Sequence, residues 1–411
     1  MTLPPQSSAR RRFVAAGLGA AAVTGLGAMG RSALAQGADF EQPFANGGRK
    51  LVAFPEKRPM IVLTSRPPQL ETPFSVFNEG ILTPNDAFFV RYHNAGIPTS
   101  VDADTHVINV AGNAAGKPFK LSVAELKTQF RPVEIVAVNQ CSGNSRGLFN
   151  PRVTGGQLAN GAMGNARWVG VPLKDILARA EVRNSARQVT FDGLDTAIRG
   201  GGDFVKALDL AQAMEPTVLV AYQMNGADLP MLNGYPVRLI VPGYYGTYWV
   251  KHLSQIEVID NVFDGFWMRP AYRIPDNDCA CVVPGTTPAA TRPIGRLTVR
   301  SFITSLADGQ RVRAGQSVAV RGIAFDSGQG IRDVGVSIDG GQNWRGAFLG
   351  EDLGRFSFRE FTFGFVPERA GVVDIRTCAW NRAGVGQPTT AVWQPAGYMR
   401  NVVESINVTV V

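Results

Sequence analysis

Apolar positions between residues 83 and 259 recur in patterns that alternate between strands and short helices. The runs "VEIVAVNQ" (133–140) and "PVRLIVPGYYG" (236–246) end in polar or glycine-rich turns, which predicts buried strands, and "TPNDAFFVRYHN" (83–94) has a similar pattern. Helical spacing occurs in "LSVAELKTQF" (121–130) and "VPLKDILARA" (171–180). In the first of these, Ser122 and Glu125 have the spacing of a capping box. Residues 40–285 are therefore predicted to form a mixed α+β domain.

The residues before and after this domain differ from it in composition and in hydrophobic periodicity. Residues 40–75 are rich in proline and are predicted to form an irregular arm. After residue 285, "GTTPAATRPIG" (285–295) is typical of a linker, and the remainder has only strand-like periods separated by turn residues. A run of about seven short strands is typical of an immunoglobulin-like sandwich, which we predict for residues 290–411.

The first 35 residues have the pattern of an export signal. Arg10 and Arg11 precede an apolar stretch, and the small residues Ala33-Leu34-Ala35 end it. The paired arginines predict a twin-arginine (Tat) signal over residues 1–35, with an ordinary Sec leader as the alternative. Because the Tat pathway exports folded proteins, a periplasmic protein that folds around a cofactor is expected.

Net charge and hydropathy exclude two classes of partner. The chain has a net charge of +8, and the predicted leader holds four arginines and no acidic residue, so +4 remains after its removal. An excess of that size does not indicate a nucleic-acid-binding protein. No later segment approaches the ~18 consecutive apolar residues of a membrane span, so a soluble protein is expected.

Cysteine spacing limits the metal and haem sites that the chain could form. The four cysteines are Cys141, Cys279, Cys281 and Cys378. An even number invites pairing in an oxidising compartment, but Cys279 and Cys281 are predicted to be too close in sequence to pair with each other, which leaves a bridge from one of them to Cys378 as an open alternative. No CxxC pair suits zinc or an iron–sulfur cluster, and the lack of CxxCH predicts no haem in this chain.

Cys141 is the main candidate for chemistry because it lies where a buried run meets the polar turn "CSGNSR" (141–146). A cysteine nucleophile would need a histidine base, and the chain has only three histidines. Nearby cations favour the thiolate form, which suits a ligand to a thiophilic metal. Arg91, Arg238 and Lys251 follow strand-like runs, as expected for a site that binds an anionic, phosphate-bearing cofactor.

Five motifs occur in an order that resembles the sulfite oxidase family of molybdenum enzymes. They are "FFVRYHN", "VNQCSGNSRG", "GNARWVGVPLKDIL", "GYPVRLIVPGYYGTYWVKHL" and "WMRPAYRIP". The chain is most similar to the exported bacterial sulfite dehydrogenases, and the resemblance covers residues 75–411. It implies a molybdenum–molybdopterin cofactor and oxidation of sulfite to sulfate, with a c-type cytochrome as electron acceptor or subunit. It also implies a possible homodimer through the C-terminal domain. The alternative is the molybdenum subunit of a sulfane or sulfur dehydrogenase of the thiosulfate-oxidising system.

The resemblance assigns roles to individual residues. Cys141 matches the molybdenum ligand. The positions that match cofactor contacts are Phe89, Val90, Arg91, Tyr92, His93, Asp195, Asn233, Arg238, Val250 and Lys251. The positions expected around the substrate are Tyr272, Arg91, His93, Arg146 and Arg400.

The chain departs from vertebrate members of the family at two of these places. Asn233 stands where they carry histidine, so that this cofactor contact is changed or lost. Ala396 stands where they carry an arginine, and Arg400 is expected to supply the missing charge.

Overall fold

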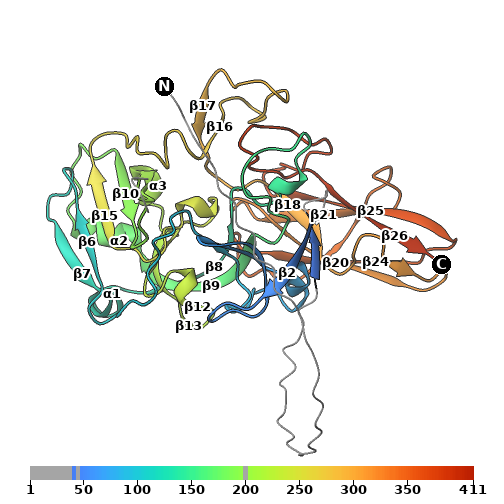
Figure 1. Cartoon of the computed structure of the whole chain (residues 1–411), viewed down its shortest axis with the longest axis horizontal. Helices are drawn as coiled ribbons and strands as arrows, with labels where there is room; N and C mark the ends of the chain where they lie inside the picture. The colour runs from blue at the N-terminus through green and yellow to red at the C-terminus, as the bar shows by residue number, and fades with distance from the viewer. Residues whose placement is uncertain (1–38, 43–46, 198–201) are drawn as a thin grey trace, which may run out of the picture. The chain divides into compact units, whose positions relative to one another are not determined.

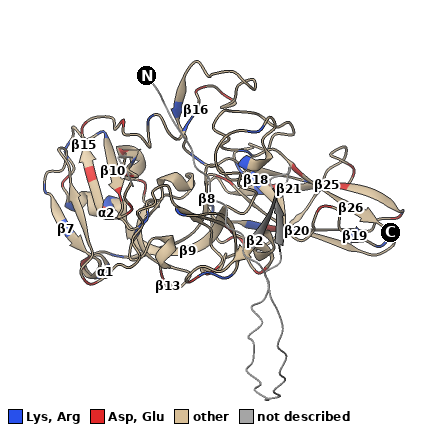
Figure 2. Ribbon diagram, viewed as in Figure 1, with Lys and Arg blue, Asp and Glu red and all other residues tan. Residues whose placement is uncertain are grey.

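The computed structural model describes residues 39–42, 47–197 and 202–411 (Figure 1). The predicted Tat signal at 1–35 lies outside these residues. Within them, no helix is both long and apolar enough to cross a membrane. Lysine and arginine residues are interspersed with aspartate and glutamate along the described chain (Figure 2).

The segment before residue 75 is made of strands, so the prediction of an irregular arm is wrong. A five-stranded sheet runs in the order β1-β2-β3-β4-β5. Its strands are β1 (Asp39–Gln42), β2 (Gly47–Val52), β3 (Met60–Ser65), β4 (Pro68–Glu71) and β5 (Val90–Arg91). Proline does not prevent this pairing, because Pro67 lies in the turn between β3 and β4 and Pro68 is the first residue of β4.

The predicted strand at 83–94 is largely wrong, since only Val90 and Arg91 pair as β5. Ala87, Phe88 and Phe89 are buried without joining a ladder. Phe88 packs edge-on against Trp168 at a centroid distance of 5.8 Å. Their apolar character therefore reflects direct packing into the core rather than a strand.

Two further sheets and three short α-helices make up the rest of this half within the described residues. One sheet has the order β11-β10-β15-β6-β7, and the other β13-β12-β9-β8 with β14 paired to β12. The strands are β6 (Val107–Ala111), β7 (Phe119–Ser122), β8 (Val133–Gln140), β9 (Met163–Pro172), β10 (Gln188–Asp192), β11 (Lys206–Asp209), β12 (Leu219–Met224), β13 (Ala227–Asp228), β14 (Arg238–Ile240) and β15 (Gln255–Ile259). The α-helices are α1 (Val123–Gln129), α2 (Leu173–Arg179) and α3 (Leu210–Ala213). The predicted helices at 121–130 and 171–180 and the strand at 133–140 are confirmed, and the strand expected at 236–246 is limited to β14 before the turn.

The C-terminal part is a two-sheet sandwich. Its sheets have the orders β18-β20-β24-β23 and β19-β26-β25-β21-β22. The strands are β18 (Arg300–Ile303), β19 (Arg311–Val312), β20 (Val318–Phe325), β21 (Ile331–Ser337), β22 (Arg345–Gly346), β23 (Phe348–Leu349), β24 (Arg359–Phe365), β25 (Gly371–Asn381) and β26 (Glu404–Val410). Val320 of β20 and Ile375 of β25 belong to one apolar cluster that contains side chains from both sheets. The predicted all-β sandwich is thus present, and its assignment as immunoglobulin-like stays a prediction.

Two features join the sandwich to the first half of the chain. Phe302 and Phe358 belong to the apolar cluster that also contains Trp168. The fully buried Arg300 donates to Ser145 Oγ at 3.0 Å and pairs with Glu404 at 3.0 Å. The two halves therefore share both a core and a buried polar network.

Between the halves lies a hairpin of β16 (Arg273–Pro275) and β17 (Thr291–Pro293), whose loop contains a disulfide between Cys279 and Cys281. The prediction that these two cysteines cannot pair is wrong. Ala280 between them has a φ of 48°, a left-handed conformation that turns the chain and brings the flanking Cα atoms to 5.1 Å. Cys378 is a buried free thiol in β25, so a bridge to it is also excluded.

The capping box at the start of α1 is present, which leads to a test. Ser122 Oγ accepts from Glu125 N at 3.2 Å, and Glu125 Oε2 accepts from Ser122 N at 2.9 Å. Ser122→Ala leaves an N-terminal amide without its partner and should lower the free energy of unfolding by about 1 kcal/mol. Thr128→Ala, on an exposed position of the same helix, should change it by less than about 0.5 kcal/mol in the same urea titration. Equal losses in the two variants would contradict the capping assignment.

Candidate functional site

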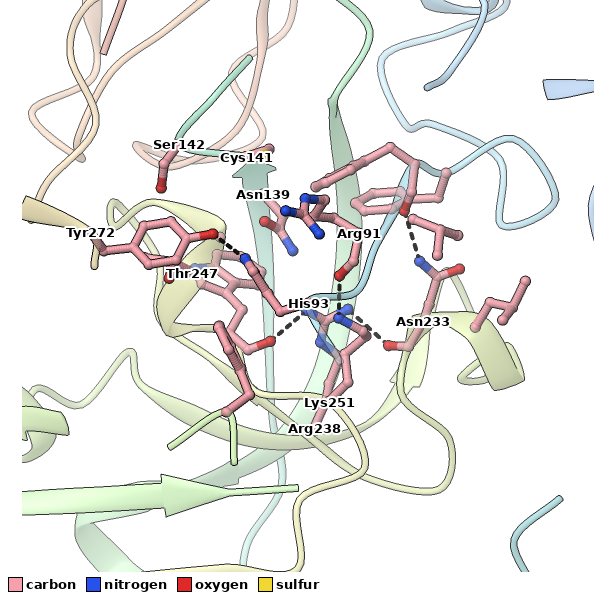
Figure 3. A pocket seen from close by; sticks show the side chains of 17 residues that line it. Arg91, His93, Asn139, Cys141, Ser142, Asn233, Arg238, Thr247, Lys251 and Tyr272 are labelled. Atoms are coloured by element: carbon pink, nitrogen blue, oxygen red, sulfur yellow. Dashed lines mark hydrogen bonds between the residues drawn. The ribbon is translucent and has the colours of Figure 1, made fainter. Parts of the chain in front are cut away.

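A cavity lies where β5, the end of β8 and the segments around β14 meet (Figure 3). Nine of the residues predicted from the sequence line it: Phe89, Val90, Arg91, His93, Cys141, Asn233, Arg238, Lys251 and Tyr272. The other lining residues are Phe88, Asn139, Ser142, Phe204, Leu232, Gly246, Thr247 and Trp249. Tyr92, Asp195, Val250, Arg146 and Arg400 were also predicted and lie outside this lining set.

Cys141 follows directly after β8 and begins the turn that contains Arg146. Its backbone amide donates to Ala162 O at 2.9 Å, and its carbonyl accepts from Asn144 N at 3.0 Å. These bonds leave the thiol directed to the cavity, where it is 8% exposed. A single buried thiol with open space beside it can act as one ligand of a metal that is held by a second group.

The cavity is lined by a buried arginine and a half-buried lysine whose hydrogen-bond acceptors are backbone carbonyls. Arg238 donates to Asn233 O at 2.8 Å and to Trp249 O at 3.0 Å, and Lys251 donates to Arg91 O at 2.7 Å. Burial lowers the pKa of Arg238 to about 10 and the pKa of Lys251 to about 7. Buried charges are usually paired, so this end of the cavity is suited to an anion such as phosphate.

Four buried polar atoms of the lining residues have no hydrogen-bond partner among the described residues. They are Asn139 Oδ1, Ser142 Oγ, Arg238 Nε and Thr247 Oγ1. Unsatisfied buried groups are costly and therefore rare. Together with the Cys141 thiol and the positive charges of Arg238 and Lys251, they fit a polar, anionic cofactor that carries a thiophilic metal.

Two predicted residues support this end of the cavity without lining it. Asp195 is buried, and burial raises its pKa while the positive charge of Lys251 opposes that rise. Tyr92 is hydrogen-bonded to His252 through Oη and Nε2 at 2.6 Å, and the Lys251 ammonium lies 4.0 Å from its ring centroid. Both therefore act on Lys251 rather than on the cavity directly.

Asn233, the position that departs from vertebrate sequences, has both its polar groups engaged by the protein. Its Nδ2 donates to Phe89 O at 3.1 Å, and its Oδ1 accepts from Lys57 Nζ at 2.5 Å. Lys57 also donates to Phe88 O at 3.1 Å, and burial lowers its pKa to about 7. The strand-rich N-terminal segment thus contributes a buried cation behind the cavity, which the sequence did not reveal.

On the other side of the cavity, His93 and Tyr272 are hydrogen-bonded to each other through Nε2 and Oη. Burial, followed by the charges of Arg91, Lys251, Lys206 and Arg146, lowers the pKa of His93 well below its ordinary value. Burial raises the pKa of Tyr272. The imidazole and the phenol are therefore both neutral, and they share one hydrogen bond. Tyr272 also has a φ of 56°, which is uncommon for a bulky residue and typical of functional sites.

The sandwich contributes Tyr398 to this side, a residue that sequence reasoning missed. Its ring stacks on that of Tyr272 with a centroid distance of 5.4 Å and an interplanar angle of 4°. The Arg146 guanidinium lies 5.0 Å from the Tyr398 ring centroid and donates to Ala396 O at 3.1 Å. Arg146 is therefore held next to the site by the segment in which vertebrate relatives are expected to carry their arginine.

Arg400, expected to supply a charge to the substrate, forms an ion pair with Glu404. Glu404 also pairs with Arg300, so one carboxylate serves two guanidinium groups. The amide of the preceding residue, Met399, donates to Ser142 O at 3.3 Å, which keeps this segment close to Cys141. The side chain of Arg400 itself is directed to Glu404, and its role in substrate binding stays a prediction.

Lys206 is a second cation that the sequence did not reveal. It is 1% exposed, and its ammonium donates to Trp267 O at 2.6 Å. The same ammonium lies 4.8 Å from the Tyr272 ring centroid and 4.9 Å from that of Tyr248. No ion pair of Lys206 with a described carboxylate is found. A carbonyl and two aromatic faces thus satisfy a buried charge beside the His93–Tyr272 pair.

Two family models match the chain. The "Oxidoreductase molybdopterin binding domain" matches residues 94–267, and the "Mo-co oxidoreductase dimerisation domain" matches residues 291–411. The first range ends before Tyr272 and begins after Arg91, while the second contains Tyr398.

Curated relatives and a solved structure agree with these matches. Mitochondrial sulfite oxidase of Homo sapiens is 36% identical over 280 residues, covering 66% of this chain and 50% of that protein. Sulfite oxidase of Arabidopsis thaliana is 31% identical over 287 residues, covering 66% of this chain and 70% of that protein. The sulfane dehydrogenase SoxCD of Paracoccus pantotrophus has a similar fold, with a TM-score of 0.71 at 22% identity and 87% of each chain covered. The chain spans about half the length of the mammalian relatives.

The buried Lys206 predicts a specific dependence of stability on pH. Burial lowers its pKa from 10.5 to about 7, so between these pH values the unfolded chain binds more protons than the folded chain. The cost of the buried charge is therefore full below pH 7 and declines as pH rises toward 10.5. The free energy of unfolding of Lys206→Met, minus that of the wild type, should fall over this range in urea titrations. Lys120→Met, which removes an exposed lysine of β7, controls for the loss of one charge. A difference that rises with pH would contradict this account of Lys206.

Proposed function

Because the chain belongs to the sulfite oxidase family of molybdenum enzymes, we propose that it oxidises sulfite to sulfate and passes the electrons to a c-type cytochrome in the periplasm. The observation that carries this proposal is the Cys141 thiol in a cavity with Arg238 and Lys251 at one end, both hydrogen-bonded to backbone carbonyls, and the His93–Tyr272 pair at the other. The first end fits the cofactor, and the second fits a small oxyanion.

Molybdenum–molybdopterin, when bound, supplies the oxygen-atom transfer and the two-electron oxidation. Cys141 is the proposed ligand of the metal. Arg238 and Lys251 would bind the phosphate, with Asp195 and Tyr92 holding Lys251. The strand-end residues Phe89, Val90 and Arg91 and the backbone around Val250 would form the wall for the pterin.

Sulfite would be bound by positive charge and by one neutral donor. Arg91 lines the cavity. The Arg146 guanidinium packs on the ring of Tyr398, which stacks on the cavity residue Tyr272. Guanidinium groups bind oxyanions through paired N–H donors, which offsets the loss of hydration. Tyr272 can donate its hydroxyl proton to an oxygen of the bound anion. Neutral His93 is hydrogen-bonded to the Tyr272 hydroxyl, so it orients that hydroxyl without adding a charge to the site.

A sulfane or sulfur dehydrogenase is the second candidate, since the fold of SoxCD matches most of the chain. The two activities differ in whether the sulfur is free or bound to a carrier protein. A cavity lined by both Arg91 and Tyr272 suits a free oxyanion better.

The family model for a dimerisation domain over 291–411 supports a homodimer, which light scattering would test.

Export by the Tat pathway predicts that Arg10→Lys with Arg11→Lys leaves the precursor inside the cell.

The proposed function is tested on exported protein by metal analysis together with a steady-state assay of sulfite and cytochrome c. Wild type should contain molybdenum and reduce cytochrome c in proportion to sulfite added. Cys141→Ser should abolish turnover, because oxygen is a poorer donor than thiolate to this metal. Cys378→Ser, which changes the buried thiol of β25, should keep the activity. Turnover in Cys141→Ser near that of wild type would contradict the ligand assignment, and inactive wild type with full molybdenum would favour the carrier-bound substrate.

Substrate binding is tested by comparing two arginines. Losing a charge-assisted contact costs about 1.5–3 kcal/mol, or roughly one to two decades in kcat/KM. Arg91→Met should show this loss, mainly as a higher KM for sulfite, and Arg400→Met should show a smaller loss because its charge is shared with Glu404. Arg332→Met, on the surface of β21, is the matched control. Unchanged kinetics of Arg400→Met with full molybdenum would assign Arg400 to the ion pair alone.

A further inference from the structure

The Cys279–Cys281 disulfide is poorly suited to stabilising the fold. A disulfide stabilises mainly by restraining the unfolded chain, and this effect grows with the length of the loop that it closes. Here the sequence separation is two residues, so the unfolded chain loses little freedom. Cys279 is exposed and Cys281 is partly exposed, so the bond is accessible to reagents in solution.

The disulfide does hold an unusual backbone conformation. Ala280 has a φ of 48°, a region that residues with a Cβ seldom adopt. Its side chain is 7% exposed and belongs to the same apolar cluster as Tyr272 and Ile274. Asn277 holds the far side of the loop, donating to Cys281 O at 2.8 Å and accepting from Cys281 N at 3.1 Å. Opening the bond would remove one of the restraints on this conformation.

The loop is joined to the candidate active site from both of its ends. On one side, Tyr272 is followed directly by β16, which runs into the loop. On the other side, Val282 N donates to Trp393 O at 2.9 Å. Gln394, the next residue, donates to Tyr398 O at 2.9 Å, and Tyr398 stacks on Tyr272. The disulfide loop is therefore connected to Tyr272 twice, once through the backbone of β16 and once through hydrogen bonds to the 393–398 segment and the stacked ring of Tyr398.

We propose that the Cys279–Cys281 disulfide is a modification site that sulfite opens. The lone pair of the sulfite sulfur attacks Cys279 Sγ, the more exposed sulfur. The Sγ–Sγ bond breaks, and Cys281 Sγ leaves with the electron pair as a thiolate. The new bond joins Cys279 Sγ to the sulfite sulfur as S-sulfocysteine, and no further oxidant or reductant takes part. Nucleophilic attack of this kind depends on access to a disulfide sulfur, which the exposure of Cys279 provides.

Opening the disulfide has a consequence for the site. It frees the loop between Asn277 and Val282, weakens the bond to Trp393, and lets the segment 393–400 with Tyr398 move away from Tyr272. The cleavage itself does not depend on the proposed function, and only its effect on turnover rests on it.

The test uses the purified holoenzyme incubated with sulfite without an electron acceptor, so that the enzyme cannot consume it. Peptide mass spectrometry should find one SO3 group at Cys279 and one new free thiol at Cys281. Hydrogen exchange should become faster in residues 393–400. Absence of the adduct would overturn the proposal, and so would an adduct that leaves exchange in 393–400 unchanged.

Two controls separate the parts of this inference. Cys279→Ser with Cys281→Ser should gain no adduct and should show fast exchange in 393–400 before sulfite is added. Cys378, a buried thiol whose Sγ lies 3.7 Å from Gln387 O, should stay unmodified in every sample. A phosphine reductant, which opens the bond without adding a group, should loosen 393–400 as sulfite does. Because these measurements need no turnover, the proposal can fail while the sulfite assay succeeds, or the reverse.

Discussion

Positive charge that is hydrogen-bonded only to neutral acceptors of the described chain is the constraint on which the site depends. Arg238, Lys251 and Lys57 are held chiefly by backbone carbonyls and one amide oxygen. Such an arrangement costs stability in the free chain, since desolvation is only partly offset by neutral acceptors. The segments that supply these carbonyls must therefore be rigid, and Phe88 and Trp249 are anchored in the shared apolar core. A bound anionic cofactor would offset this desolvation free energy, so cofactor binding should raise the free energy of unfolding.

The site is assembled from segments that are far apart in sequence. Cys141 comes from the end of β8, Arg91 from β5 and Tyr272 from the segment before β16. Tyr398 comes from the sandwich and completes an aromatic stack with Tyr272. Arg146 lies between the two halves, bound to Ala396 O and packed on Tyr398. The electrostatic environment of His93 and Tyr272 is therefore a joint property of both halves of the chain.

Local patterns in the sequence predicted local structure well. The capping box at Ser122, the two helices and the strand before Cys141 have clear periodicity, and the structure contains them. The strand prediction for 83–94 failed because an apolar run that packs directly into a core has the same composition as a strand. The pairing of Cys279 with Cys281 depends on a left-handed Ala280, which no spacing rule reveals. Lys206 and Tyr398 depend on contacts across more than 60 residues of sequence, so their nearness to Tyr272 could not be read from their neighbours.

The contact of Ala396 and Tyr398 with Arg146 and Tyr272 joins segments that are synthesised at different times. Ribosomes deliver the N-terminal part of a protein first, and its domains generally fold as they emerge. The wall made by β5, β8 and β14 can therefore form while the sandwich is still missing. Ala396 and Tyr398, which lie against Arg146 and Tyr272, come after these strands in the chain and are synthesised later. The last side of the site to be made is therefore the one that the sandwich supplies.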